Sequence, residues 1–348
     1  EWNLDFPHTM LRAKAIKFRK GIPASEKFLA STDVHGKFAG IPVVVQVANA
    51  VNHARPARAA MEKVLGVHQD AWLPDLATRK FRSGAPRSQP FPVQDGAKTP
   101  GKVAIYSTCY INYNEPGIGH DLLKVLEHNQ VPYELVEKEK CCGMPKLELG
   151  DLEGVDKLKQ VNIPVLARYA REGWAILSAV PSCTLMYKQE LPLMYPGDAD
   201  VQADREAMWD PFEYLSARRR DGLLKTDFSQ PLGKISYHTP CHGRVQNIGK
   251  RTEEILKLVP GTQVATHERC SGHAGTYGVK KAYHPMAMKI GKPLFKRMSE
   301  HPAGGAPDYI SSDCPLGGHH IAQGFEVNEL GTPQLAHPLS LVRKAYGI

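Results

Sequence analysis

The sequence lacks a hydrophobic run long enough to cross a membrane as a helix. The longest stretch without Asp, Glu, Lys or Arg covers residues 38–54, and Pro42 interrupts it. A membrane-spanning helix needs about 20 predominantly apolar residues. We therefore expect no transmembrane span. The apolar part of this stretch, residues 41–51, is predicted as a buried helix or a partner interface, with a membrane-surface segment as the alternative.

Cysteine is scarce and unevenly placed. There are 7 cysteines in 348 residues, and none precedes Cys109. An odd number excludes complete pairing in disulfides, and a chain of this length does not need them for stability. We therefore expect reduced thiols that act as ligands or as ordinary core residues, in a cytoplasmic protein.

The sequence also lacks blocks of like charge. Its 44 Lys and Arg outnumber 36 Asp and Glu, for a net charge of +8, but the excess is spread along the chain. The densest cluster, Arg218, Arg219 and Arg220, is followed directly by Asp221 and is interpreted as a solvated face. No nucleic-acid-binding signature accompanies it, so we expect no nucleic-acid partner.

Beyond residue 101 the chain alternates between buried strands and amphipathic helices, and it does so twice. This alternation is typical of a parallel sheet with helical crossovers, and it predicts an α/β fold. The predicted strands are residues 103–107, 133–136 and 174–180, then 234–238, 262–266 and 309–312, with helices at 119–129, 153–171, 250–259, 285–298 and 338–346. The predicted organisation is a mostly helical or irregular N-terminal region with a Pro- and Gly-rich linker (1–100), a first domain (101–195), a connecting segment (196–232), a second domain (233–330) and a tail (331–348).

The cysteines repeat with the predicted elements. Three of them recur after 132, 129 and 131 residues (241 − 109, 270 − 141 and 314 − 183), and Cys141-Cys142-Gly143 is echoed by a Cys-Ser-Gly sequence. Chance placement would rarely do this, so the repeat indicates an internal duplication. The first set comprises Cys109, Cys141, Cys142 and Cys183, and the second comprises Cys241, Cys270 and Cys314.

Each of these cysteines follows a predicted strand. The loops after the carboxyl ends of neighbouring parallel strands meet in one crevice, so each set should converge. Iron–sulfur clusters are held by thiolates, commonly four. Zinc also accepts four thiolates, and single buried cysteines are common in protein cores. The adjacent pair Cys141-Cys142 favours a multi-iron cluster over structural zinc, because zinc-binding pairs are usually spaced further apart, but the three alternatives stay open here.

With its degenerate second copy, the pattern Cys109…Cys141-Cys142-Gly143…Cys183 resembles the cysteine-rich CCG-domain family. This family includes the B subunit of heterodisulfide reductase, the iron–sulfur subunit of glycolate oxidase and the iron–sulfur C subunit of anaerobic glycerol-3-phosphate dehydrogenase. The resemblance implies two pseudo-repeated parallel-sheet CCG domains behind the N-terminal region. It also implies a [4Fe–4S] cluster on the first set of cysteines.

The resemblance further implies a redox role and redox partners. Family members pass electrons between a flavoprotein dehydrogenase and a quinone or disulfide acceptor, and many carry a ferredoxin-like domain before the CCG pair. We therefore expect an iron–sulfur electron-transfer subunit of an oxidoreductase complex rather than a complete enzyme. Its partners would be a flavoprotein dehydrogenase or another redox subunit, and a ferredoxin-like domain or subunit. Peripheral association with the inner face of the membrane fits the same resemblance.

The second set departs from the family pattern. Ser271 stands where the first set has Cys142, so a second cluster, a zinc ion or an empty site are all open. A fourth ligand would come from Ser271, a nearby histidine or an exogenous group, and we favour His273, three residues after Cys270, because imidazole can replace thiolate. The other histidines weighed are His242, His319 and His320.

Two other functions stay open at the sequence level. A thiol–disulfide redox enzyme of the heterodisulfide-reductase type would use a reactive Cys142 or Cys270 with a lowered pKa. A non-enzymatic scaffold stabilised by zinc is the other.

Overall fold

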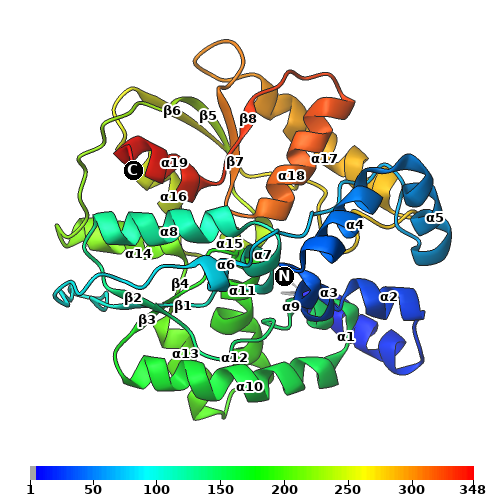
Figure 1. Ribbon diagram of the computed structural model, residues 1–348, viewed down its shortest axis with the longest axis horizontal. Helices are drawn as coiled ribbons and strands as arrows, with labels where there is room; N and C mark the ends of the chain where they lie inside the picture. Colours follow the sequence, from blue (N-terminus) through cyan, green and yellow to red (C-terminus); the bar gives the residue numbers. More distant parts are fainter. Residues whose placement is uncertain (1–4) are drawn as a thin grey trace.

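The computed structural model describes residues 5–348 and contains two four-stranded sheets (Figure 1). The first has the strand order β2-β1-β3-β4 and the second β6-β5-β7-β8, so the two halves share one topology. Every pairing in both sheets is parallel. The predicted α/β pseudo-repeat is confirmed. Residues 1–4, the start of the predicted N-terminal region, lie outside the described residues.

Each sheet has one strand more than the sequence analysis predicted. The added strands pair with β3 and β7, and each has only two residues, too few to show an alternating pattern. The strands are β1 (Val103–Ile105), β2 (Tyr133–Leu135), β3 (Ala175–Leu177), β4 (Met208–Trp209), β5 (Gly233–His238), β6 (Thr262–His267), β7 (Tyr309–Ser312) and β8 (Gln334–Leu335). The predicted five-part division of the chain stays a prediction.

Helices cover both sheets. Strands β1 and β3 are buried at every position, as expected of parallel strands covered on both faces. The helices of the first half are α7 (Cys109–Tyr113), α8 (Pro116–His128), α9 (Met144–Leu149), α10 (Leu152–Arg171), α11 (Pro181–Leu185), the π-helical turn η2 (Met186–Glu190), α12 (Leu191–Met194), α13 (Ala199–Ala207) and α14 (Pro211–Arg220). Those of the second half are α15 (Cys241–Arg244), α16 (Arg251–Leu256), α17 (His284–Ser299), α18 (Pro315–Val327) and α19 (Pro338–Tyr346).

The two halves share one hydrophobic core. Helix α19, at the end of the chain, packs against α8 of the first half. Arg343 Nε lies 2.7 Å from Asp121 Oδ1, and the ring of Tyr346 lies 4.2 Å from that of His128, centroid to centroid. The two cysteine-rich halves are therefore held in fixed relation to each other.

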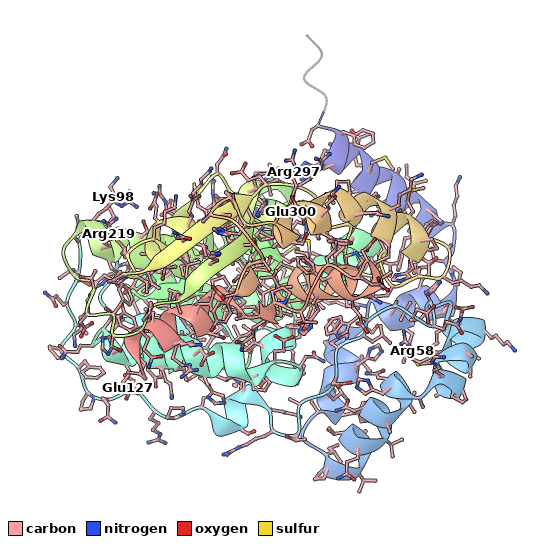
Figure 2. All side chains as sticks on the ribbon, turned by 90° about the horizontal axis from the view of Figure 1, so that it is seen from above. Arg58, Lys98, Glu127, Arg219, Arg297 and Glu300 are labelled. Atoms are coloured by element: carbon pink, nitrogen blue, oxygen red, sulfur yellow. The ribbon has the colours of Figure 1, made fainter. Side chains whose placement is uncertain are left out.

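One charge assignment from the sequence needs correction. Arg219 lies at the edge of the molecule in Figure 2, and Arg219 and Arg220 are exposed. Arg218, however, is 3% exposed, and its guanidinium donates to the carbonyl of Gln94 and lies over the ring of Tyr214. The helical period turns Arg218 inward beside Tyr214, so the solvated face includes only its two neighbours.

Residues 5–84, here called the N-terminal arm, are helical except mainly for the loop at residues 66–80. They form α1 (Phe6–Arg19), α2 (Ala24–Leu29), α3 (Thr32–His35), the 3-10 turn η1 (Gly36–Phe38), α4 (Pro42–His53), α5 (Arg55–Leu65) and α6 (Phe81–Gly84). Within α4 only Val45 is buried, while Val43 is 70% and Val47 is 59% exposed. The prediction of a buried helix is therefore wrong, and the surface alternatives remain. Over residues 5–348, no helix combines the length and the apolar composition needed to cross a bilayer.

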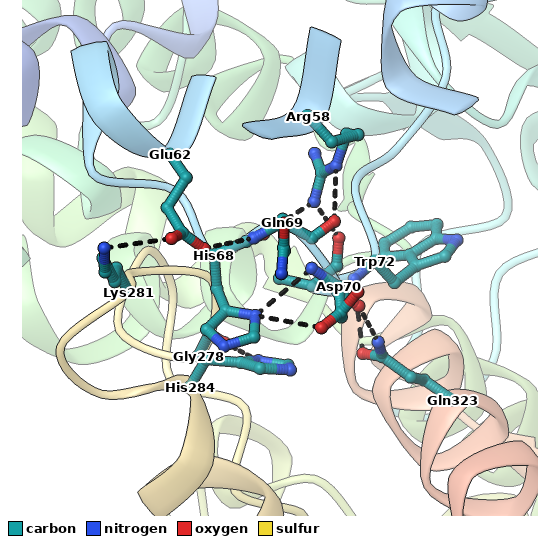
Figure 3. A network of polar contacts seen from close by, with 11 residues as sticks. Arg58, Glu62, His68, Gln69, Asp70, Trp72, Gly278, Lys281, His284 and Gln323 are labelled. Carbon is teal, nitrogen blue, oxygen red and sulfur yellow. Dashed lines mark hydrogen bonds and ion pairs between the residues drawn. The ribbon is translucent and has the colours of Figure 1, made fainter. Parts of the chain in front are cut away.

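The arm precedes the first half in sequence and contacts both halves, and Figure 3 shows its contacts with the second half. The amide of His68 donates to the carbonyl of Val279 over 2.8 Å, and the amide of Lys281 donates to the carbonyl of Gly66 over 2.7 Å. Glu62 pairs with Lys281 over 3.0 Å, and the amide of Trp72 donates to Gln323 over 3.3 Å. These contacts tie the arm to α18 and to the loop before α17.

The side chain of Arg58 fixes the shape of the docking loop from inside. It is 5% exposed, and it donates to the backbone carbonyls of His68, Gln69 and Ala71 (Figure 3). A buried guanidinium that satisfies several carbonyls in one loop leaves that loop little freedom. The arm is therefore a rigid attachment rather than a loose extension.

Candidate metal centres

All seven cysteines lie just beyond the carboxyl ends of strands. Cys109 begins α7 after β1, and Cys183 lies in α11 after β3. Cys241 begins α15 after β5, and Cys314 caps α18 after β7. The Cys141-Cys142 pair follows β2, and Cys270 follows β6. The topology predicted from the sequence therefore brings each set to one sheet edge.

The four thiols of the first set follow one another as close neighbours. Cys109 is a close neighbour of Cys141, Cys141 of Cys142, and Cys142 of Cys183, as their mutual effects on pKa show. Three of these residues are buried, and Cys109 is partly buried. Thiols that lie 32 and 41 residues apart in the chain (141 − 109 and 183 − 142) are thus gathered in one place.

Close packing changes the acidity of these thiols. Contacts with Cys109 and then with Cys142 hold the pKa of Cys141 well below its usual range. The contact with Cys141 and burial raise the pKa of Cys109. Cys142 has a raised pKa for the same reasons, with Cys183 as a further neighbour. The set therefore favours a first thiolate at Cys141, and four thiolates together would need positive charge such as iron supplies.

A turn with glycine two residues after cysteine occurs in both halves. Gly143 has φ +97° and its amide donates to Cys141, while Gly272 has φ +86° and its amide lies 3.3 Å from Cys270 Sγ. A positive φ is a conformation that glycine adopts without strain. In both halves this glycine therefore turns its amide toward the sulfur of the cysteine.

Buried polar side chains hold the loop that carries Cys141 and Cys142. Asn162 accepts from the amide of Lys140 over 2.8 Å and donates to the carbonyl of Cys141 over 3.1 Å. It also donates to the Tyr187 hydroxyl over 2.9 Å, and the Tyr106 hydroxyl donates to the carbonyl of Lys140. These groups satisfy the backbone of an irregular buried loop, which would otherwise be costly.

The second set is more open. Cys241 and Cys270 are exposed and in contact with each other, and this contact lowers the pKa of Cys270 to about 6. Cys314 is partly buried, and burial raises its pKa to about 11. Its sulfur accepts the amide of Gly317 over 3.3 Å. The structure therefore gathers the second set as well, but around a more solvent-exposed pair.

The histidine favoured as a fourth ligand lies among other histidines. The ring of His273 lies 6.0 Å from that of His320, and burial, then His320 and His242, lowers its pKa to about 3. It is therefore neutral at physiological pH, the form that binds metal. Ser271 lies in the neighbourhood of Cys314, because a Cβ placed at Gly317 would sit 3.5 Å from Cys314 Sγ and 3.8 Å from Ser271 Oγ.

The other two histidines have different surroundings. His242 Nδ1 lies 2.8 Å from Ser182 Oγ, next to Cys183, and it links α15 to α11 across the two halves. His319 pairs with Glu115, which accepts the Tyr110 hydroxyl over 2.7 Å beside Cys109. These bridges place the first and second sets on facing sides of one interface.

Sequence reasoning missed Thr32, which lies beside the first set. Thr32, on the N-terminal arm, has its hydroxyl 3.6 Å from Cys109 Sγ and 3.7 Å from Cys141 Sγ. No cysteine precedes Cys109, so nothing in the pattern linked the arm to the site. Only the tertiary structure reveals this contact.

The donor set fits an iron–sulfur cluster by its chemistry. It offers four mutually close thiols, an amide aimed at one of them and a hydroxyl that contacts two of them. Such clusters take thiolate ligands and are tuned by hydrogen bonds to sulfur. Within residues 5–348, no three or more His, Cys, Asp or Glu side chains have the arrangement that a single metal ion requires.

Comparison with known proteins points the same way. The Cysteine-rich domain family, CCG, matches residues 103–188 and 235–322. The C subunit of the anaerobic glycerol-3-phosphate dehydrogenase of Escherichia coli K12 is 28% identical over 341 residues, covering 96% of this chain and 80% of that protein. The B subunit of the fumarate reductase (CoM/CoB) of Methanothermobacter marburgensis is 26% identical over 261 residues, covering 73% of this chain and 48% of that protein.

A third relative is smaller. Lactate utilization protein A of Bacillus pumilus is 28% identical over 244 residues, covering 68% of this chain and 96% of that protein. The comparisons confirm the resemblance stated from the cysteine pattern. They also agree with the predicted class of function, an iron–sulfur electron-transfer subunit of an oxidoreductase.

Proposed function

Because this chain belongs to the CCG cysteine-rich domain family, we propose that it carries electrons on a [4Fe–4S] cluster held by Cys109, Cys141, Cys142 and Cys183. The observation that supports this most is the row of close neighbours that these four thiols form, although they come from three separate strand ends. A cluster of this kind supplies a reversible one-electron carrier when bound. The protein's own task is to bind it, exclude water and direct hydrogen bonds to its ligands.

Cysteine-to-serine variants test this ligand set. The single variants C109S, C141S, C142S and C183S should each lose most iron and acid-labile sulfide of the first site and the EPR signal of its reduced cluster. The variants C241S, C270S and C314S are matched controls for the EPR signal of the first cluster, because they change cysteines of the same chain outside its proposed ligand set. Undiminished iron in C142S, or a wild-type protein that holds zinc alone, would contradict the proposal.

The proposal extends to the partners. Two of the relatives are named as subunits of a dehydrogenase and of a reductase, which supports a partner that is a flavoprotein dehydrogenase or another redox subunit. A ferredoxin-like domain or subunit would continue the electron path toward a quinone or disulfide acceptor. Affinity purification from the native host under anaerobic conditions should recover a flavin-containing chain, and a homogeneous single chain would count against it.

We also propose a cytoplasmic location with peripheral attachment to the inner face of the membrane. Support comes from the exposed apolar side chains Val43 and Val47 on α4 and from the basic last turn of α1, with Lys17 and Arg19. Exposed apolar side chains and basic side chains on the same arm suit an anionic lipid surface. Co-sedimentation with anionic but not zwitterionic vesicles, lost in V43D/V47D, would support this, and a failure to bind either kind of vesicle would refute it.

The second set is proposed to hold a metal through Cys241, Cys270 and Cys314, with His273 as fourth ligand. The contact between two of the thiols and the neutral state of the imidazole support this. Metal analysis of C142S, from which the first cluster is removed, reads the second set alone. Residual iron indicates a second cluster, and residual zinc indicates a zinc site. Either metal should be lost when H273A is added to C142S. Absence of both refutes the proposal.

A second candidate function is favoured by one observation, the exposure of Cys241 and Cys270 in mutual contact. In thiol–disulfide chemistry the Cys270 thiolate would attack a substrate disulfide and release one thiolate. Cys241 would then displace the second thiol and form the Cys241–Cys270 disulfide, which two electrons from the redox partner would reduce. Alkylation of the metallated protein discriminates the two functions, because a free Cys270 favours this one and a protected Cys270 favours a metal.

A further inference from the structure

The N-terminal arm delivers a hydroxyl to the first set of cysteines. Thr32 Oγ1 lies 3.6 Å from Cys109 Sγ and 3.7 Å from Cys141 Sγ, both within hydrogen-bonding range for sulfur. Thr32 is the first residue of α3 and belongs to neither cysteine-rich domain. The site is therefore completed by a segment 77 residues before its first cysteine (109 − 32).

The position of Thr32 is fixed by the packing of the next turn. Gly36 is buried against the ring of Tyr113, and a Cβ there would approach a ring carbon to 1.9 Å. Tyr113 is the last residue of α7, the helix that begins at Cys109. The carbonyl of Tyr113 also accepts the amide of Ala77 over 2.7 Å. The arm is thus held against the helix that carries one of the two sulfurs.

The arm is held at its other end by the second half. The contacts of Glu62, His68 and Trp72 with residues of the second half fix the segment that follows α5 (Figure 3). Lys280 further pairs with Glu26 of α2 over 3.2 Å, a few residues before Thr32. Thr32 is therefore supported from both sides rather than carried on a free loop.

The protonation state of the cysteine sulfur decides the direction of its hydrogen bond with Thr32. Between a hydroxyl and a neutral thiol either atom can donate. A thiolate that ligates iron has no proton, so the Thr32 hydroxyl becomes the donor. Reduction adds negative charge to the cluster and its sulfurs, and a donor stabilises that reduced state more than the oxidised one. The hydroxyl should therefore raise the reduction potential.

We propose that Thr32 is a positioning residue of the N-terminal arm that donates its hydroxyl hydrogen to the Cys109 and Cys141 sulfurs and so raises the reduction potential of the first cluster. This rests on the proposed function, because it presupposes a cluster on those cysteines. It assigns a role to the arm that the cysteine-rich domains alone do not supply.

The test compares variants at Thr32 in the full chain loaded with cluster. T32V removes the hydroxyl at constant size, and T32S keeps the hydroxyl. S31A is a matched control, because the Ser31 hydroxyl donates to the carbonyl of Lys27 instead of a sulfur. An EPR-monitored redox titration should place T32V at a more negative potential, with T32S and S31A close to the wild type.

The outcomes separate the two levels of the proposal. A wild-type protein without iron and sulfide would overturn the proposed function together with the role of Thr32. A loaded T32V protein with an unchanged potential would overturn the role of Thr32 alone, and so would an equal shift in T32S. If T32V does not load, T32A removes the same hydroxyl with a smaller side chain and is judged by the same titration.

Discussion

Side chains other than the cysteines hold the loops of the first set and contact its sulfurs. Asn162 bonds the backbone on both sides of the Lys140–Cys141 junction, and Thr32 touches two sulfurs from another part of the chain. The seven cysteines could be singled out from the sequence because their spacing repeats. Asn162 and Thr32 could not, because an asparagine in a helix and a threonine in a polar turn are unremarkable until the fold brings them to the site.

A buried carboxyl far from the cysteines carries a cost that depends on pH. Asp204 in α13 is 1% exposed and its Oδ1 has no hydrogen-bond partner. Burial raises its pKa well above the usual 3.8. The folded protein therefore favours the neutral acid. The contribution of Asp204 to the free energy of unfolding is fully present at low pH and is lost as the pH rises above about 3.8.

D204N should remove this dependence. We expect its free energy of unfolding to exceed that of the wild type by about 1–3 kcal/mol at pH 8, with the difference shrinking toward pH 5. Chemical denaturation at several pH values measures this. E206Q changes an exposed carboxylate on the same helix and should have little effect at any pH. A gain in D204N that does not vary with pH would disprove the explanation.

At the scale of elements, the strands that carry the cysteines follow from the sequence. The strand at Tyr309–Ser312 and the helix at Pro338–Tyr346 have the predicted bounds, because each is an uninterrupted apolar or amphipathic segment. The short helices that begin at Cys109 and Cys241 were not predicted, since four or five residues show no helical period. Helix α18 was missed too, because Gly317 and Gly318 lie in its first turns.

The turn after Cys270 leaves no room for a side chain. Gly272 has φ +86°, and a Cβ there would lie 2.0 Å from the carbonyl oxygen of Ala287 in α17. G272A should therefore strain the backbone and displace α17, with a loss of several kcal/mol in the free energy of unfolding.

Gly331 provides the control for that variant. It has φ +95° but nothing within 4 Å of an added Cβ. G331A should lose only about 1 kcal/mol, the cost of the positive φ alone. Thermal unfolding of both variants gives the comparison. Equal losses in the two would show that contact with α17 does not matter.

At the scale of the whole molecule, the arm joins parts of the chain that the sequence separates. A Pro- and Gly-rich linker was predicted at the end of the N-terminal region, and residues 85–101 are without helix or strand. The sequence did not reveal that the arm lies against α18 and the loop before α17. Single side-chain contacts such as Glu62–Lys281 and Trp72–Gln323 leave no periodic signal in either partner.

Cutting the linker tests whether the arm is held by these contacts. A protease site inserted between Arg87 and Ser88 should, after cleavage, leave both fragments eluting together in gel filtration. The Glu62–Lys281 ion pair and the Trp72–Gln323 hydrogen bond help to keep the arm in place without a covalent link. The double variant E62A/Q323A should weaken the association. Separation of the cleaved fragments while Glu62 and Gln323 are both present would mean that the linker alone holds the arm.

The quantity of iron and acid-labile sulfide per chain, measured on anaerobically purified protein, tests the central claim most directly. A [4Fe–4S] cluster on Cys109, Cys141, Cys142 and Cys183 predicts about four of each from the first site, lost in C142S and retained in C270S. A protein that holds zinc without sulfide, or one in which C142S keeps its full iron, would contradict it.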